Sequence, residues 1–194
     1  MNVLNIIQID LSKFDCSNVL SCNLMFAYCS NVKEINLGKL DFSLVTDFSH
    51  MFHGCNNLVN LDVTNFNTKN SKSFYQMFRY CYNLKKIDVS KFNSSKCETI
   101  NLMFQDCKSI TEIDMINWDM SNLKFDNDYG NPIDYLFCNC SNLKKIKISG
   151  NLKKEEANKN YYLHIFDDIP KSGELITKKN VECNIPLDGY LPQN

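Results

Sequence analysis

The sequence predicts an α/β repeat fold, a solenoid with one parallel β-sheet to which each repeat contributes a short strand and a short helix. Two observations predict this class. A pair of apolar residues followed by a cysteine recurs at a fixed period, and a second apolar signature follows each copy in register. The two signatures have different internal periods, one typical of a helix and one typical of a strand.

The repeat period is 26 residues. The first signature is Met-Phe or Leu-Phe with a cysteine three positions after the phenylalanine, and its copies begin at Met25, Met51, Met77, Met103 and Leu136. The last copy arrives after 33 residues instead of 26, and the extra residues fall in the polar stretch 126–132, which contains glycine and proline. We therefore expect a loop insertion there.

The spacing within each signature predicts its local structure. Cys22, Met25, Phe26 and Cys29 stand at positions i, i+3, i+4 and i+7, the spacing of one helix face. The second signature alternates apolar, polar and apolar residues, as in 61–63, which is strand periodicity. Each repeat is thus predicted to be a short helix, a turn, a short strand and a polar loop. Strands of successive repeats should lie about 4.8 Å apart.

The chain divides into two predicted parts. Residues 1–150 hold about five repeats and a partial copy before them, and form the predicted solenoid. Residues 151–194 hold three of the four prolines and are predicted to form a C-terminal cap or tail over the last coil. The first strand has no predicted cap, so we expect that the chain is a fragment or that this edge pairs with another chain.

Composition excludes several classes of protein. The chain has 194 residues, 21 basic against 22 acidic side chains and a net charge of −1, which argues against a nucleic-acid partner. Its apolar runs fall far short of the roughly 20 residues that a membrane helix needs, so no membrane insertion is expected. Asp10 and Asp15 lie where a signal peptide would be apolar. The sequence therefore lacks an apparent export signal, and we expect the chain to be intracellular or truncated.

The ten cysteines mostly follow the repeat. Five of them form one inward column and are predicted to be buried reduced thiols, because five in a column cannot all pair: Cys29, Cys55, Cys81, Cys107 and Cys140. Cys22 and Cys97 fill other repeat columns. Cys16, Cys138 and Cys183 have no role in the repeat.

Motifs for catalysis or metal binding are weak. His50 and His53 offer half of a metal site, but no third ligand recurs at a fixed spacing. Cys138 and Cys140 are a single close pair, whereas a zinc site needs two such pairs. Nucleophile–base motifs and glycine-rich phosphate loops are missing from the sequence. We expect no metal, no cofactor and no enzyme activity.

The outward strand positions are the candidate binding residues. One column reads Gln8, Glu34, Asn60, Lys86, Glu112 and Lys145, and the next reads Asp10, Asn36, Asp62, Asp88, Asp114 and Lys147. The acidic column has two interpretations. It is a docking stripe for a basic partner or a weak cation site, although Ca²⁺ needs six to eight oxygens around one point. Alternatively it is structural, each carboxylate accepting hydrogen bonds from backbone N–H groups or from hydroxyls such as those of Ser12, Thr64 and Ser90.

The repeat also resembles a known family. The pattern Met-Phe-x-x-Cys-x-x-Leu-x-x-Leu-Asp-Val, followed by Ser or Thr and Phe, resembles the BspA-like leucine-rich repeats over residues 3–150. It is most similar to the variant in mycoplasma-type surface lipoproteins, which has no assigned function. The resemblance implies a leucine-rich-repeat-like solenoid whose outward columns line a concave sheet face. It also implies a secreted or cell-surface location, binding of host or matrix components, and no enzyme activity.

Three functions follow from these observations. The favoured one is a non-enzymatic, adhesin-like interaction module that binds a protein or glycan partner, not yet identified, on its concave sheet face. The second is a structural unit of a larger surface or virion assembly, self-associating through the N-terminal edge. The third is a β-solenoid polysaccharide-active enzyme. Acid–base catalysis needs two carboxylates in different environments, whereas here one residue type recurs in one environment.

Overall fold

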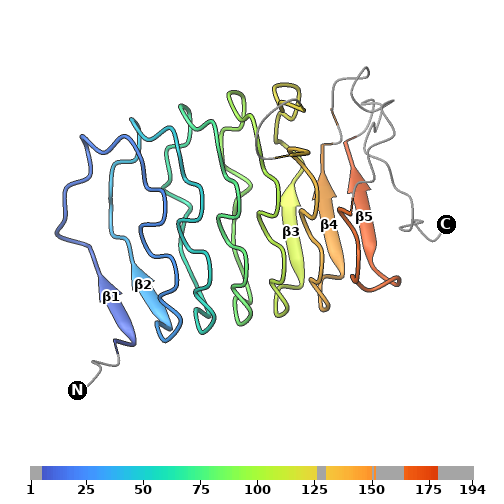
Figure 1. Ribbon diagram of the computed structural model, residues 1–194, viewed down its shortest axis with the longest axis horizontal. Helices are drawn as coiled ribbons and strands as arrows, with labels where there is room; N and C mark the ends of the chain where they lie inside the picture. The colour runs from blue at the N-terminus through green and yellow to red at the C-terminus, as the bar shows by residue number, and fades with distance from the viewer. Residues whose placement is uncertain (1–5, 126–129, 150, 152–163, 179–194) are drawn as a thin grey trace.

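The chain winds into a row of stacked coils, with the strands β1 (Gln8–Asp10) and β5 (Glu174–Thr177) near opposite ends of the row (Figure 1). The computed structural model describes residues 6–125, 130–149, 151 and 164–178. Its other strands are β2 (Glu34–Asn36), β3 (Glu112–Met115) and β4 (Lys145–Ile148). All of their pairings are parallel, β1 with β2 in one sheet and β3, β4 and β5 in another.

The predicted single sheet is wrong, because the middle coils do not form strands. Isolated parallel bridges join Glu34 to Asn60 and Asn60 to Lys86. Only one residue of each middle coil makes this pairing, so the hydrogen-bonded ladder is too short to connect the two sheets. Corresponding positions of neighbouring coils still lie side by side.

The predicted helices are also wrong, and with them the predicted strand-plus-helix solenoid. The described residues contain no helix, and residues 22–29 and their equivalents, which we call the turn segments, form consecutive tight turns. In the first turn segment Leu24 and Tyr28 have φ angles of 60° and 62°, in the left-handed region that a right-handed helix excludes. The same two positions have positive φ in the later coils, at His50, Gly54, Gln76, Tyr80, Leu102, Asp106, Tyr135 and Asn139.

The backbone amides of a turn segment alternate between two kinds of partner. The Met25 amide donates to the Cys22 carbonyl at 3.1 Å and closes a turn within the coil. The neighbouring amides of Leu24 and Phe26 donate to Ser49 and Met51 of the next coil, at 3.1 and 2.9 Å. An α-helix would direct every amide to the carbonyl four residues earlier. Here half of the amides instead attach each coil to the next one.

Aromatic rings stack along the core, one from each coil. The centroids of Phe26 and Phe52 lie 5.4 Å apart, those of Phe52 and Phe78 5.6 Å, and those of Phe78 and Phe104 5.5 Å, with the rings within 14° of parallel. These side chains are buried. Such pairs contribute about 0.5–1.5 kcal/mol each beyond the burial of their area. The residues whose spacing resembled a helix face therefore point inward and pack one coil on another.

The cysteine column adds a second row of contacts between coils. Each thiol donates to the carbonyl of the phenylalanine in the preceding coil: Cys55 to Phe26, Cys81 to Phe52, Cys107 to Phe78 and Cys140 to Phe104, at 3.0–3.2 Å. The prediction of buried reduced thiols is confirmed for these four, and Cys29 is free but half-buried. Cys183 lies outside the described residues.

Residues 164–178 form part of a further coil. Strand β5 pairs with β4, the Phe137 amide donates to the Ile165 carbonyl at 3.0 Å, and the rings of Phe137 and Phe166 stack at 6.1 Å. The rest of the predicted C-terminal cap, apart from Asn151, lies outside the described residues, so the cap stays a prediction. None of the described segments forms a helix long and apolar enough to cross a membrane.

The left-handed turn position can be tested at the exposed residue Leu24. We expect Leu24→Gly to be more stable than Leu24→Ala by about 1 kcal/mol, because only glycine adopts positive φ without steric cost. In a helix the order would reverse by a similar amount. Ala27, which is not among the positive-φ residues, is the matched control, and Ala27→Gly should destabilise. Urea unfolding of the variants measures these differences, and an alanine-over-glycine order at position 24 contradicts the turn.

The thiol column predicts a resistance to alkylation. Burial raises the pKa of Cys55 to about 12 and that of Cys81 well above its usual value of 9.0. A raised pKa in the folded state means stability that is complete below about pH 9 and is lost as the pH rises toward 12. Iodoacetamide at about pH 8 should therefore leave both thiols unmodified until urea unfolds the chain. Mass spectrometry reads this out, and native-state labelling faster than unfolding contradicts it.

Candidate functional site

The predicted binding residues form two adjacent rows on one surface, which we call the strand face. Gln8 pairs with Glu34 in β1 and β2, and Glu112 pairs with Lys145 in β3 and β4. Isolated bridges from Glu34 to Asn60 and from Asn60 to Lys86 extend the first pair by two coils. The second row, of Asp10, Asn36, Asp62, Asp88, Asp114 and Lys147, stands two residues further along each coil. The structure thus brings all twelve predicted residues onto one face; whether they bind a partner stays a prediction.

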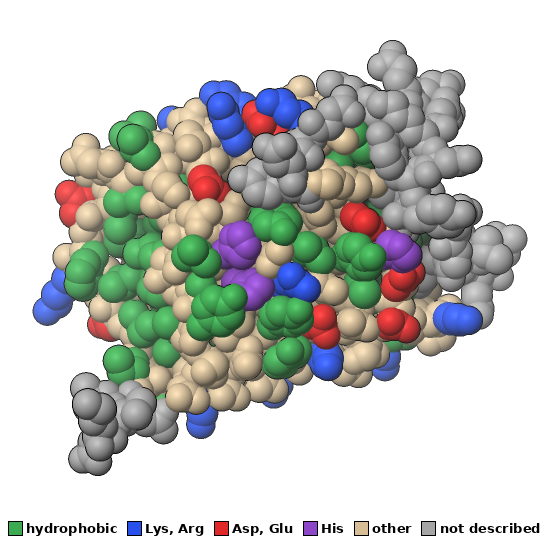
Figure 2. Space-filling model, viewed as in Figure 1, with side chains coloured by type: hydrophobic (Ala, Val, Ile, Leu, Met, Phe, Trp, Pro, Cys, Tyr) green, Lys and Arg blue, Asp and Glu red, His purple; other side chains and the backbone are tan. Residues whose placement is uncertain are grey.

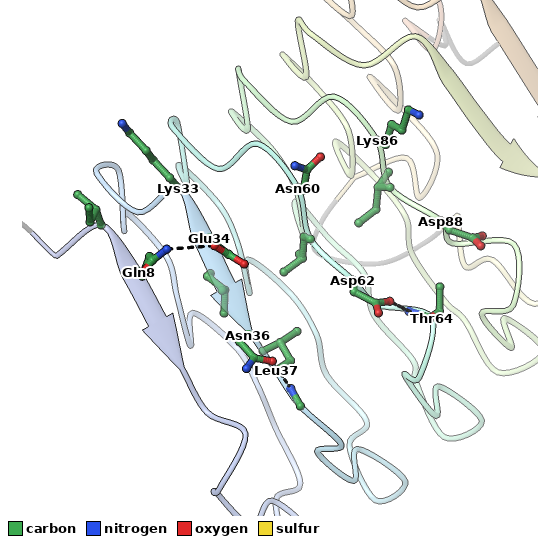
Figure 3. Close-up of a pocket in the computed structure, with 15 residues that line it drawn as sticks. Gln8, Lys33, Glu34, Asn36, Leu37, Asn60, Asp62, Thr64, Lys86 and Asp88 are labelled. Atoms are coloured by element: carbon green, nitrogen blue, oxygen red, sulfur yellow. Dashed lines mark hydrogen bonds between the residues drawn. The ribbon is translucent and has the colours of Figure 1, made fainter.

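The first four coils of this face enclose a groove of about 910 Å³. This volume lies within the range of about 300–1,000 Å³ that ligand pockets show. Its charged lining is Glu34, Asp62, Asp88, Lys33 and Lys86, and Figure 3 shows these side chains projecting from neighbouring coils. The Gln8 amide donates to the Glu34 carboxylate at 3.1 Å across the first two coils.

The aspartates of the second row close turns. Asp62 Oδ1 accepts the Thr64 backbone N–H at 2.9 Å and the Thr64 hydroxyl at 2.6 Å. Asp88 Oδ1 accepts the same pair of donors from Ser90, at 3.0 and 2.6 Å. Asn36 occupies the same place with its amide oxygen, which accepts the Gly38 N–H at 3.1 Å. The structural interpretation of this column is therefore confirmed in its hydrogen bonds.

These hydrogen bonds also fix the charge of the groove. They lower the pKa of Asp62 and of Asp88, the hydroxyl bonds from Thr64 and Ser90 being the largest cause. Both carboxylates are consequently ionised at neutral pH. Both of the bonds to each carboxylate use Oδ1, so Oδ2 keeps its capacity to accept from another molecule.

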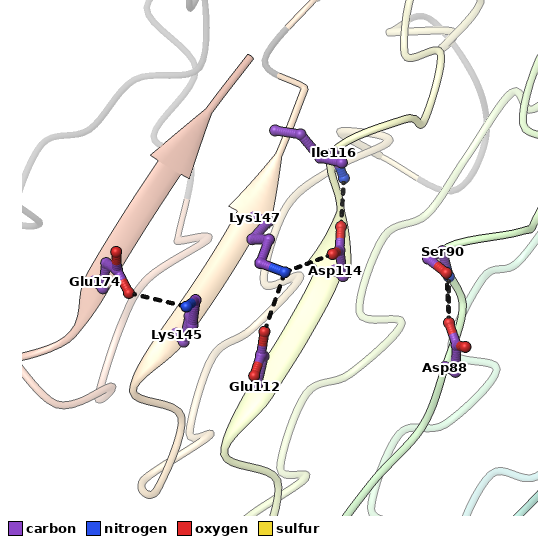
Figure 4. A network of polar contacts seen from close by, with 8 residues as sticks. All are labelled: Asp88, Ser90, Glu112, Asp114, Ile116, Lys145, Lys147 and Glu174. Carbon is purple, nitrogen blue, oxygen red and sulfur yellow. Dashed lines mark hydrogen bonds and ion pairs between the residues drawn. The ribbon is translucent and has the colours of Figure 1, made fainter. Parts of the chain in front are cut away.

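The C-terminal half of the face neutralises its own carboxylates. Lys147 Nζ lies 2.8 Å from Asp114 Oδ2 and 3.3 Å from Glu112 Oε1, while Lys145 Nζ lies 3.3 Å from Glu174 Oε2 (Figure 4). The bonds to Asp114 and Glu112 raise the pKa of Lys147. Among the described residues no comparable ion pair engages the groove carboxylates. The strand face is therefore self-neutralised at one end and open to cations at the other.

The two aspartates of the groove lack the unlike environments of a catalytic pair. Asp62 and Asp88 have equivalent partners, and both have a pKa shifted downward, whereas acid–base catalysis needs carboxylates whose pKa values separate. Within the described part of the chain no three His, Cys, Asp or Glu side chains are grouped so that they could hold a metal ion. His50 and His53 lie in a turn segment, and burial lowers the pKa of His53 to about 4.

Sequence reasoning missed some residues of the groove. Lys33 and Thr64 line the groove but are not among the predicted binding residues. Lys33 lies just before the alternating strand positions, and the sequence indicates Thr64 only as a hydrogen-bond partner of Asp62. Lys33 directly precedes the outward residue Glu34, and this adjacency was the only signal in the sequence that could have identified it.

The turn-closing role of Asp62 predicts different effects for two substitutions. Asp62→Ala should lower the free energy of unfolding by about 1 kcal/mol through the lost hydrogen bonds. Asp62→Asn should be nearly neutral, because Asn36 closes the same turn.

The pH dependence of this effect has a defined sign. The Asp62 pKa is lowered in the folded state, so its contribution is complete above the usual value of 3.8 and is lost as the pH falls through the folded value. The difference between wild type and Asp62→Ala should thus shrink at about pH 3, as measured by urea unfolding. Equal destabilisation by Asn and Ala would contradict the turn-closing role.

Comparison with known proteins identifies the family. No curated protein matches the chain. A family model described as "Mycoplasma protein of unknown function, DUF285" matches residues 21–145, which is more than half of the chain and spans the coils that build most of the groove. The chain belongs to the DUF285 family of mycoplasma proteins of unknown function.

Proposed function

We propose that the protein is a non-enzymatic, adhesin-like interaction module whose strand face binds a protein partner through basic side chains. The observation that carries this proposal is the charge asymmetry of the face. Lys147 and Lys145 pair with the carboxylates at the C-terminal end, while the groove presents ionised Asp62 and Asp88 without such partners among the described residues. Lysine or arginine side chains of a partner would supply the missing cations.

The geometry of the groove favours an extended partner over a single ion. Its carboxylates are Glu34, Asp62 and Asp88, one from each of three successive coils, which is unlike the six to eight converging oxygens of a Ca²⁺ site. Exposed charge pairs of this kind direct association and fix register more than they add affinity, and salt screens them over about 8 Å at physiological ionic strength. Binding should accordingly weaken as salt is raised.

The family supports an interaction role without defining it. DUF285 has no assigned function, so the proposal takes its partner chemistry from the groove and not from the family. The similarity of the repeat to BspA-like surface proteins agrees with an adhesin-like location and role. Equivalent environments along the acidic row argue against the polysaccharide-enzyme alternative.

One observation favours self-association as a second candidate function. Core positions are exposed in the first coil, Phe14 by 65% and Met25 by 41%, whereas the equivalent residues Phe66 and Met51 are buried. A coil from a second copy would cover these side chains. This surface lies at the end of the stack and leaves the groove accessible, so the two functions are compatible.

The groove proposal is tested with variants that remove charge and keep the turns. The double variant Asp62→Asn, Asp88→Asn should weaken binding of a basic peptide roughly two- to thirtyfold, from about 0.2–1 kcal/mol for each exposed pair. Peptides are selected from a random display library on the immobilised full chain, then synthesised and measured by calorimetry at low and high salt.

Asp41→Asn is the matched control. Asp41 accepts the Ser43 N–H at 2.8 Å in an equivalent turn away from the groove, so this variant also loses one carboxylate. It should bind like wild type. Selected peptides that lack lysine and arginine, or that bind the double variant as tightly as wild type, would overturn the proposal.

A further inference from the structure

A second hollow lies on the surface formed by the turn segments, which we call the turn face. It encloses about 370 Å³, and its lining includes Arg79, Gln105, Asn131 and Tyr135. Figure 2 shows a face on which hydrophobic side chains gather around two neighbouring histidines. The hollow is lined in part by Asn131, which belongs to the stretch where the repeat period changes from 26 to 33 residues. Insertions into repeats often build the binding face of such proteins.

The residues of the hollow attach neighbouring coils through their backbone, as where the Gly54 amide donates to the Arg79 carbonyl at 2.8 Å, but this bond does not require a particular side chain. The column of stacked core phenylalanines keeps one residue type in all five coils. The column that contains Arg79 changes in every coil, reading Ala27, His53, Arg79, Gln105 and Cys138. Arg79 is also the only arginine among 21 basic residues. A position that varies while the scaffold repeats is free to serve recognition.

Three of the residues that line the hollow carry a polar atom without a hydrogen-bond partner in the described part of the chain. Arg79 Nε, Gln105 Oε1 and Asn131 Nδ2 are buried, and none of them has a hydrogen-bond partner among the described residues. Leaving such an atom unpaired costs about 1–3 kcal/mol, so a side-chain rotation that brings it to a polar group bound in the hollow is favourable. Two are donors and one is an acceptor. A ligand that satisfies all three must both donate and accept, as a set of hydroxyl groups does.

Two tyrosine rings form apolar walls beside these atoms. Tyr75 contacts His50 edge-on at 5.0 Å, and Tyr135 stacks on His164 at 4.7 Å. Aromatic faces suit the C–H surface of a sugar ring, and the planar guanidinium and amide groups suit adjacent hydroxyls. Asp134 also lines the hollow, its Oδ1 accepting the amides of Tyr135 and His164. An arginine and an aspartate together favour a ligand with no net charge.

We propose that this hollow binds a neutral pyranose sugar, with Arg79, Gln105 and Asn131 as the hydroxyl-binding residues and Tyr75 and Tyr135 as the walls. The site lies on the turn face and is independent of the strand-face groove. The sugar is either a free monosaccharide or the end of a glycan chain, since both present the same ring and hydroxyls.

The proposal is tested by NMR titration of the labelled full-length chain. The probes are methyl α-D-glucopyranoside, methyl α-D-galactopyranoside, methyl α-D-mannopyranoside, their free parent sugars and D-glucuronate. At least one neutral sugar should cause saturable shifts in the side-chain N–H signals of Gln105, Asn131 and Arg79 at millimolar concentration. Glucuronate should bind more weakly, since Asp134 disfavours a second carboxylate. Binding of the methyl glycoside assigns a glycan end, and binding of the free sugar alone assigns a monosaccharide.

Matched variants make the result specific. Arg79→Lys keeps the charge but loses Nε, and should weaken binding roughly tenfold. Asn131→Ala should do the same and serves if the first variant folds poorly. Lys108→Ala is the control and should bind the sugar as wild type does. Lys108 lies over the Tyr82 ring at 5.0 Å, much as Arg79 lies over Tyr80, but it is not among the residues that line the hollow.

The test also separates this site from the strand-face groove. The Asp62→Asn, Asp88→Asn double variant should bind the sugar like wild type. The proposal is overturned if no neutral sugar shifts these signals, if Arg79→Lys and Asn131→Ala bind as wild type does, or if glucuronate binds most tightly.

Discussion

The hydrogen bonds that run from one turn segment to the next determine the rest of the structure. Alternate amides, such as those of Leu24 and Phe26, donate to Ser49 and Met51 of the following coil. This alternation requires positive φ at two positions of each turn segment, which the chain accepts at leucine, tyrosine and histidine despite a steric cost of about 1–2 kcal/mol each. Once neighbouring coils are fixed in this register, equivalent side chains lie directly over one another. The phenylalanine stacks and the bonds from thiols to carbonyls follow from that alignment.

The sequence was sufficient to predict which residues share a column but not the backbone that aligns them. The pairing of Gln8 with Glu34 follows from the 26-residue period and from strand alternation, both visible in one sequence. The helix was a wrong prediction because consecutive tight turns also place residues i, i+3, i+4 and i+7 inward. Glycine or asparagine at every left-handed position would have signalled the turns. Only Gly54 and Asn139 do so here, and the other positions hold residues such as Leu24 and Tyr80 that are ordinary in a helix.

The candidate sites were predictable to different degrees. The acidic row was visible as a column, and the bond from Thr64 to Asp62 followed from the short spacing between them. The difference in charge between the two ends of the strand face was not visible in the sequence. It depends on the ion pair of Lys147 with Asp114, which lie on either side of the insertion, and on the ion pair of Lys145 with Glu174, which belongs to a segment without a recognisable repeat. The hollow on the turn face was missed for a similar reason. It arises where coils of unequal length meet, and a method based on a constant period does not describe that place.

The two faces differ in how freely their residues can vary. On the strand face each Asp or Asn of the second row closes a turn, so a substitution that keeps the turn needs a side chain with an acceptor at the same distance, as Asn36 has. On the turn face the side chain in the column of Arg79 changes from coil to coil, although each backbone amide of the column closes a turn and His53 and Cys138 are buried. Substitution in this column is therefore limited by burial in some coils, whereas in the second row of the strand face it is limited by the turn-closing acceptor. The repeat therefore leaves two places where side chains vary most, the first row of the strand face, which holds acidic, basic and amide residues, and the Arg79 column of the turn face.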